Sequence, residues 1–477
     1  MKKGLKLFAT GFIAMSALAM NVNAEEVSNE TELNTCIAKT NNICKLTSNV
    51  VLSKVVDIKD GVDVVLDLNG HSIKPNETLV VTGGLIQVIH GGKLTVQDSG
   101  ENGIISAVSS KVYGAIQVTK KDHTNINKPA TLVINDWNIE GYYYAITGSG
   151  NADRINTNIT INGGKLTSLK SDTGLGIYHP QDGNLIVNGG EIVGATGIEM
   201  RAGKLNVTGG TIRGTYKPIE VNSNKNGSTT SGAGIAVAQH TTEKAIDVTI
   251  SGGTIEGYTA LYESNPEENE ITSIKKISIK ITGGTFNAIN EGKNAIYSEN
   301  VTGFITSGEF NSDVTDYLAS VTNLNKTENG YEAETTYEVT KGEEQKVTIK
   351  KGTEVTITID ADFDLFKNLY INNKLVDKKY YTVKSGSTII TLNSDFVETL
   401  EKGEYEVTAE FTDGGTATTN LTVLSNNTSE ETTAETTTKK VEYPKTSDYI
   451  IIYIMLWILS LLGLTTISKS IYKSNKI

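Results

Sequence analysis

A short phrase built around two adjacent glycines recurs through the middle of the chain. Each copy contains an alternating apolar–polar segment, one small polar residue, the glycine pair and a second short apolar segment. The first glycines fall at positions 163, 189, 209, 252 and 283, so successive copies are 26, 20, 43 and 31 residues apart. Periods of about 20–50 residues indicate stacked units that bury their apolar faces on one another. The copies are Ile159–Leu166, Leu185–Ile192, Leu205–Ile212, Val248–Ile255 and Ile279–Phe286.

The residues of the repeat select an all-β architecture. Val, Ile, Thr and Gly dominate, and apolar residues recur at every second position rather than at the 3.6-residue period of a helix. A propeller blade needs about 40 residues, more than the two shortest spacings provide. Coils of a parallel β-helix, stacked about 4.8 Å apart, fit the period. An antiparallel sandwich with glycine-rich hairpins is the alternative.

The glycine pair suits a corner between two strands, because glycine adopts positive φ without a steric penalty. The longer spacings require a loop or an extra turn. The small polar side chain before each pair would then stack from coil to coil as a polar ladder. The predicted members of the ladder are Asn162, Asn188, Thr208, Ser251 and Thr282.

The segment Leu66–Ile73 and the repeated Asn/Ser-Gly-Gly-x-Ile phrases resemble right-handed β-helix domains of the pectate-lyase-like superfamily. More narrowly, they are similar to the adhesive versions on Firmicutes surface proteins. The resemblance covers roughly residues 45–320. It implies the fold but no single activity, because that superfamily contains lyases, hydrolases and non-enzymes. We expect a β-helix over residues 25–322, in which Glu30 to Leu46 caps the open first coil.

The beginning of the chain predicts export. Residues 1–24 resemble a secretory signal peptide, with Lys2, Lys3 and Lys6 before an apolar stretch and a small-residue cleavage site at Ala24. Cys36 and Cys44 lie eight residues apart, which in an exported chain favours a local disulfide. Two free buried thiols are the alternative.

A different pattern follows the repeats. About seven short strands occur between residues 323 and 424, which is typical of a β-sandwich. Leu369–Leu375, Thr388–Leu392 and Leu400–Tyr405 resemble the X2-type immunoglobulin-like module of bacterial surface proteins, which we interpret first as a spacer. Residues 425–442 are rich in Thr, Ser and Glu and predict a disordered stalk.

Residues 443–477 resemble a Gram-positive cell-wall sorting signal. A short motif precedes an apolar run over 449–467, long enough for a transmembrane helix, and a basic tail. The resemblance implies that sortase cleaves after the threonine and links the protein to peptidoglycan. A Tyr stands where the family has Leu, and a Ser where it has Gly, so a plain membrane anchor is the alternative. The motif consists of Tyr443, Pro444, Lys445, Thr446 and Ser447.

One outward row of the β-helix predicts a ligand-binding face. If Ile177, Ile198 and Ile219 point into successive coils, the residue after each points outward. Aromatic side chains stack on sugar rings, and charged groups bind hydroxyls, so we expect a polysaccharide or host surface ligand. The net charge of −12 argues against nucleic acid. The predicted ligand-contacting residues are Tyr178, Glu199, Arg201, Glu220, Tyr262 and Tyr297.

Three interpretations apply to Glu199, Glu220 and Arg201. The two carboxylates, about 5 Å apart on adjacent coils, have the spacing of a retaining glycosidase pair. The second interpretation is half of a Ca²⁺ site, with Arg201 as the base of a lyase. The third interpretation, which we favour, is an exposed surface where Arg201 neutralises two acids. His179 is expected to point inward.

We therefore expect a surface-anchored binding or adhesion protein of a Gram-positive bacterium, without a cofactor or metal ion. A wall-bound polysaccharide lyase or glycoside hydrolase is the first alternative. A structural surface spacer is the second.

Overall fold

The structure is a computed structural model that describes residues 24–118, 127–150, 155–219, 229 and 231–426. The predicted signal peptide, except for Ala24, lies outside these residues. So do the predicted stalk beyond Asn426, the sorting motif and the apolar run. In the described part of the chain, no helix is both long and apolar enough to cross a membrane.

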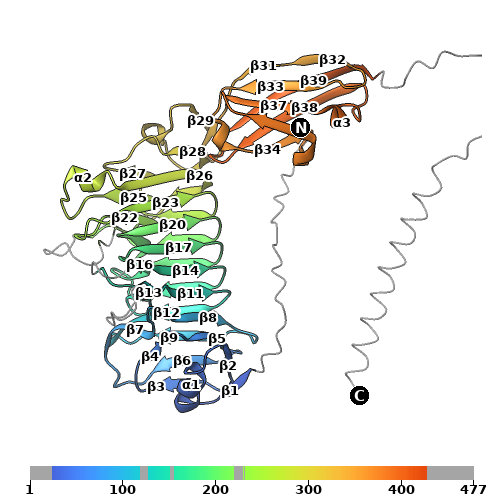
Figure 1. The fold of residues 1–477 in the computed structure, drawn as a ribbon. Helices are drawn as coiled ribbons and strands as arrows, with labels where there is room; N and C mark the ends of the chain where they lie inside the picture. The colour runs from blue at the N-terminus through green and yellow to red at the C-terminus, as the bar shows by residue number, and fades with distance from the viewer. Residues whose placement is uncertain (1–23, 119–126, 151–154, 220–228, 230, 427–477) are drawn as a thin grey trace, which may run out of the picture. The chain divides into compact units, whose positions relative to one another are not determined.

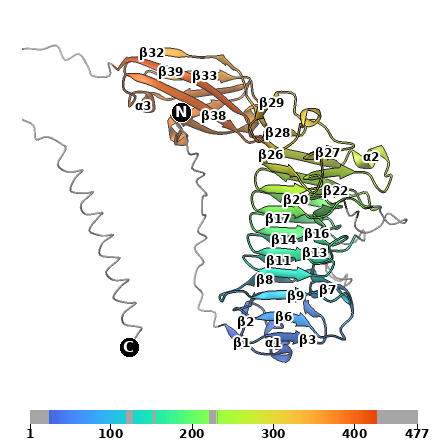
Figure 2. The same cartoon turned by 180° about the vertical axis from the view of Figure 1, so that it is seen from behind.

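The described residues are mostly β-strands, and three long stacks of parallel strands run through the first part of the chain (Figures 1 and 2). One strand from each stack makes up a coil, an arrangement compatible with a parallel β-helix. The first stack consists of β1 (Glu25–Val27), β2 (Asn42–Leu46), β5 (Asp63–Asp67), β8 (Lys93–Gln97), β11 (Ala130–Ile134), β14 (Thr157–Ile161), β17 (Gly183–Val187), β20 (Gly203–Val207), β23 (Ile246–Ile250), β26 (Ile277–Ala288) and β28 (Ile305–Phe310).

The second stack merges with the first at β26, and the third forms a separate sheet. The second stack consists of β3 (Val50–Leu52), β6 (Ser72–Pro75), β9 (Ile104–Ala107), β12 (Asn138–Gly141), β15 (Lys165–Ser168), β18 (Glu191–Gly194), β21 (Thr211–Gly214) and β24 (Thr254–Gly257). The third consists of β4 (Val56–Ile58), β7 (Val81–Val88), β10 (Val112–Val118), β13 (Tyr144–Thr147), β16 (Leu175–His179), β19 (Thr196–Met200), β22 (Ile235–Ala238), β25 (Leu261–Ser264) and β27 (Ile296–Ser298).

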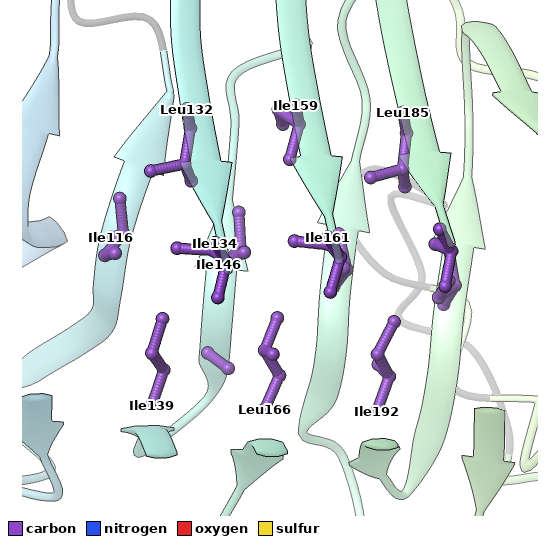
Figure 3. Close-up of a cluster of buried hydrophobic side chains, with 14 of the residues drawn as sticks. Ile116, Leu132, Ile134, Ile139, Ile146, Ile159, Ile161, Leu166, Leu185 and Ile192 are labelled. Carbon is purple, nitrogen blue, oxygen red and sulfur yellow. The ribbon is translucent and has the colours of Figure 1, made fainter. Parts of the chain in front are cut away.

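The repeated phrases lie on parallel strands, not on antiparallel hairpins. Ile159 pairs with Leu185 in parallel register, and Leu185 pairs with Leu205. Alternate apolar side chains stack as columns inside the coils, as Figure 3 shows for Leu132, Ile159 and Leu185. These side chains are almost fully buried, and each contributes about 1.5–3 kcal/mol relative to an exposed position.

Both glycines of a corner are required by its geometry. Gly190 has a φ of +84°, a conformation that other residues rarely adopt. A Cβ on Gly189 would lie 2.6 Å from the carbonyl oxygen of Asn162 on the preceding coil. The amide of Asn188 donates to Asn162 at 2.9 Å, and Asn162 donates to Asn135 at 3.0 Å. Thr208 continues this ladder by donating to Asn188 at 3.0 Å. The hydroxyl of the next predicted member, Ser251, instead donates to the Val207 carbonyl oxygen at 3.5 Å, so the polar ladder is confirmed for Asn162, Asn188 and Thr208.

Short elements cover both ends of the stacks. The helix α1 (Glu30–Ile37) begins at Asn29, whose side chain accepts a hydrogen bond from the Glu32 amide at 3.1 Å, and buries Leu33 and Ile37 in the core. Cys36 and Cys44 form a disulfide between this helix and β2. At the other end, the antiparallel hairpin of β29 (Thr322–Thr327) and β30 (Gly330–Thr335) pairs with β28. The remaining helical segments are α2 (Ile271–Ile274), α3 (Ser394–Val397), η1 (Thr315–Tyr317), η2 (Phe363–Leu365) and η3 (Lys378–Tyr380).

Two further sheets share a separate hydrophobic core. The seven strands expected from sequence are present, and the short strands β31 and β35 were not predicted. The first sheet contains β31 (Val339–Lys341), β33 (Val355–Ile359), β37 (Thr388–Leu392) and β36 (Tyr381–Lys384); the second contains β32 (Gln345–Ile349), β39 (Thr416–Asn426), β38 (Gly403–Phe411), β34 (Phe366–Ile371) and β35 (Lys374–Leu375).

Candidate functional site

The third stack carries the predicted outward row. Tyr178 pairs with Glu199, and Glu199 with Ala236. Ala236 then pairs with Tyr262, and Tyr262 with Tyr297. Strand alternation places these side chains on the face opposite the buried isoleucines. The row is therefore continuous across five strands, from β16 to β27.

Ala236 follows Glu199 in this row, so the predicted Glu199–Glu220 rung is wrong. β19 pairs directly with β22, so that Ile235 rather than Ile219 occupies the coil after Ile198. Ile219 lies in the insertion between β21 and β22 and is only partly buried, and Glu220 itself lies outside the described residues. The 43-residue spacing holds one coil with an insertion, and sequence alignment mistook part of the insertion for a strand.

The middle of the row is buried, so the expectation that these side chains form an open ligand-binding face is wrong there. Tyr178 is 8% exposed, and Glu199 and Arg201 are 0% exposed. Tyr144 stacks on Tyr178 with ring centroids 5.5 Å apart. The Thr229 amide, from the insertion between β21 and β22, donates to both carboxylate oxygens of Glu199 at 2.9 and 3.0 Å.

Arg201 does neutralise two carboxylates, but the second is Glu267 rather than Glu220. Its Nη1 lies 3.8 Å from Glu199 Oε1, and its Nη2 forms an ion pair with Glu267, whose side chain is 3% exposed. Burial raises the pKa of Glu199, and the Arg201 charge opposes that rise. Glu267 lies 66 residues from Arg201 in the chain, and no sequence pattern marked it as a partner.

This buried cluster does not have the accessibility that polymer cleavage requires. A glycosidase carboxylate must contact the sugar, whereas both oxygens of Glu199 accept from the protein backbone. His179 points inward as expected, and its Nδ1 lies 3.1 Å from the Ala202 carbonyl oxygen. Burial lowers the pKa of His179 to about 4, so the ring is neutral at physiological pH. Glu199 and Arg201 therefore form a buried structural cluster on the outward face, and His179 is buried separately on the inward face.

The far end of the row is open. Tyr262 and Tyr297 stack with ring centroids 5.1 Å apart and an angle of 16° between the rings, and Tyr297 is 38% exposed. The neighbouring Leu261 and Ile296 are buried, so the alternation of the two strands directs both tyrosines outward. The stack is a partly exposed aromatic surface, in which Tyr297 on β27 is exposed and Tyr262 on β25 is half-buried.

A pocket of about 260 Å³ adjoins this stack. Tyr262, Ser264 and Asn265 line it from β25 and the turn that follows. Glu299 contributes from the segment after β27, and its Oε2 accepts from the Asn265 amide at 3.0 Å. Residues of the insertion between β21 and β22 complete the lining; they include Ile219, Thr229 and Ser231.

The pocket, defined here as the Tyr262 pocket, combines an aromatic face with hydroxyl, amide and carboxylate groups. These are the groups that orient polar ligands in protein sites. Among the described residues, no three acidic, His or Cys side chains lie close enough together to hold a metal ion.

A second group of aromatic side chains lies on the earlier coils. The ring of Tyr143 contacts Tyr113 and Tyr142, each with centroids 4.9 Å apart. Tyr113 has the same 38% exposure as Tyr297. Trp137 is partly buried and packs against the hydrophobic core.

No protein-family model matches the chain, and no curated protein matches its sequence.

Proposed function

We propose that this protein is a surface-displayed binding protein whose Tyr262 pocket contacts a glycan. The exposed stack of Tyr262 on Tyr297 carries the proposal, since it lies beside polar groups from Ser264, Asn265 and Glu299. A sugar ring presents one apolar face and several hydroxyls, which match an aromatic surface and hydrogen-bonding side chains.

The display architecture remains part of the proposal. The parallel stacks would be a right-handed, pectate-lyase-like β-helix, and the two-sheet unit an X2-type immunoglobulin-like spacer. The sequence over 425–477 supports a stalk and an anchor to the wall or membrane of a Gram-positive cell. Fractionating cells that express Thr446→Ala tests the anchor: sortase linkage predicts loss from the wall fraction, whereas a membrane anchor leaves the distribution unchanged.

A glycan array probed with the full-length protein tests the binding proposal. We expect retention on at least one glycan class and at least tenfold weaker retention for Tyr262→Ala, because alanine removes the stacking surface. Tyr297→Ala should weaken binding less, since Tyr297 supports the stack from the next strand.

Tyr113→Ala is the matched control, because Tyr113 and Tyr297 are equally exposed but only Tyr297 stacks on a residue of the pocket. Loss of binding in Tyr113→Ala alone would move the site to the earlier aromatic group. Retention on no glycan would favour the structural-spacer alternative. Release of oligosaccharides, abolished by Glu199→Gln, would establish the enzyme alternative.

A further inference from the structure

The charge of the Tyr262 pocket restricts the glycans that it can accept. Glu299 is the one ionisable carboxylate among the described lining residues, and none of those residues is Lys, Arg or His. Among these described residues, an anionic sugar would therefore meet a carboxylate without a compensating cation. The inference rests on the proposed glycan-binding function and concerns the chemical class of the ligand.

The nearby arginine does not change this balance. Arg201 is fully buried, and its guanidinium is engaged by Glu199 and Glu267. The chain as a whole carries a net charge of −12, so its long-range field also favours cationic over anionic ligands.

A hydrogen bond holds the Glu299 carboxylate at the wall of the pocket. One carboxylate oxygen accepts from the Asn265 amide, which ties the side chain to the turn that lines the pocket. The charge of Glu299 also acts on the Tyr262 phenol and contributes to its raised pKa, after burial and Tyr297. The carboxylate and the aromatic ring thus lie within reach of one small ligand.

We propose that the Tyr262 pocket binds an amino sugar with a free amine, whose ring lies on Tyr262 and whose ammonium group pairs with Glu299. A carboxylate that faces an ammonium group makes a charge-assisted hydrogen bond, about twice as strong as a neutral one. Tyrosine faces attract ammonium groups as well. Acetylation removes the charge of the amine and therefore both contributions. A uronic acid carries a carboxylate, which Glu299 would repel.

The test measures binding of three hexasaccharides to the full-length protein by calorimetry: hexaglucosamine, hexa-N-acetylglucosamine and hexagalacturonate. We expect about tenfold tighter binding of hexaglucosamine than of its acetylated form, and no detectable binding of hexagalacturonate. Raising the salt from 0.05 to 0.5 M should reduce the preference, since ion pairs at exposed sites are screened.

Glu299→Gln keeps the size of the side chain and removes its charge. This variant should lose most of the preference for hexaglucosamine and keep only the smaller part that the tyrosine faces provide. Glu354→Gln is the matched control: it changes the net charge by the same amount at an exposed position of the two-sheet unit, and should keep the wild-type preference.

Two results would overturn the amino-sugar assignment. The first is equal or tighter binding of an acetylated or acidic oligomer; the second is a preference that Glu299→Gln does not reduce. In either case, a loss of binding in Tyr262→Ala would leave the pocket as a glycan site of another class. Binding of none of the three oligomers also overturns the assignment, and the glycan array then decides the proposed function separately.

Discussion

Two stretches of one sheet face differ in their exposure to solvent. Tyr178, Glu199 and Arg201 lie near the middle of the third stack and are buried, whereas Tyr262 and Tyr297 lie at its end and border a pocket. The same strand alternation directs the side chains of both stretches away from the coil interior. The difference comes from the chain segments that follow β21 and β25, which supply Thr229 and Glu267 to the buried stretch. Alternation predicts which face a residue occupies, and the insertions decide whether that face meets solvent.

Replacing the buried cation should have the largest effect on stability. Arg201→Met leaves Glu199 and Glu267 buried without their partner, which costs about 3–5 kcal/mol. Unfolding of the full-length protein in denaturant would show this loss of stability as a large shift of the unfolding midpoint toward lower denaturant concentration. A change below about 1 kcal/mol would mean that the cluster is hydrated rather than buried.

Acidification should have the next largest effect on stability. Burial lowers the pKa of both His179 and His240 from 6.5 to about 4. The unfolded chain therefore binds protons between about pH 6.5 and 4 that the folded chain does not. The stabilisation is complete above about pH 6.5 and is lost as the pH falls toward 4, by up to about 3 kcal/mol for the fully buried His179 and by less for His240.

Glu199 acts in the opposite direction, because its raised pKa favours the folded state in acid. Melting temperatures of the wild type and His179→Gln between pH 7.5 and 4.5 separate the contributions. The variant should lose less stability on acidification than the wild type. Parallel curves would show that His179 does not contribute.

Paired tyrosine substitutions separate stability from binding. Tyr178→Leu should destabilise by about 1–3 kcal/mol, because leucine leaves the buried site badly filled, and should leave glycan affinity unchanged. Tyr297→Leu should cost less than about 0.5 kcal/mol in stability and weaken binding about threefold to tenfold, through loss of aromatic stacking. The comparison fails if Tyr178→Leu weakens binding while the protein stays folded.

The smallest effect is expected at a second arginine, Arg213 on β21, whose side chain is partly exposed. Arg213 lies 2.7 Å from Glu256, but its side chain is 41% exposed. Exposed ion pairs contribute at most about 1 kcal/mol, so Arg213→Met should hardly alter the unfolding transition. An effect equal to that of Arg201→Met would contradict the distinction between buried and exposed arginines.

Much of the stacked region could be predicted because its rules are local. The period-two pattern placed Ile198 inside and Tyr262 outside, and the glycine pairs marked the corners. The last pair departs from this rule, because Gly283 and Gly284 lie within the continuous strand β26. The stacking of Tyr262 on Tyr297 follows from equal positions in adjacent coils.

The site was harder to predict because its decisive contacts are distant in the chain. Repeat alignment could not distinguish Ile219 from Ile235 as the next coil position, since both begin a plausible apolar–polar segment. It paired Glu199 with Glu220, whereas Arg201 binds Glu267 from a later turn.

The order of amino acids alone settled where the strands run, which side chains point inward and where the coils turn, because these depend on neighbours a few residues away. Folding in three dimensions determined which segments are insertions, which carboxylates share Arg201 and which tyrosines stay exposed. Those outcomes depend on burial, and burial is set by whichever distant segment comes to rest over a side chain. Glu199 therefore looked like a surface residue in the sequence, whereas its side chain is buried in the folded protein.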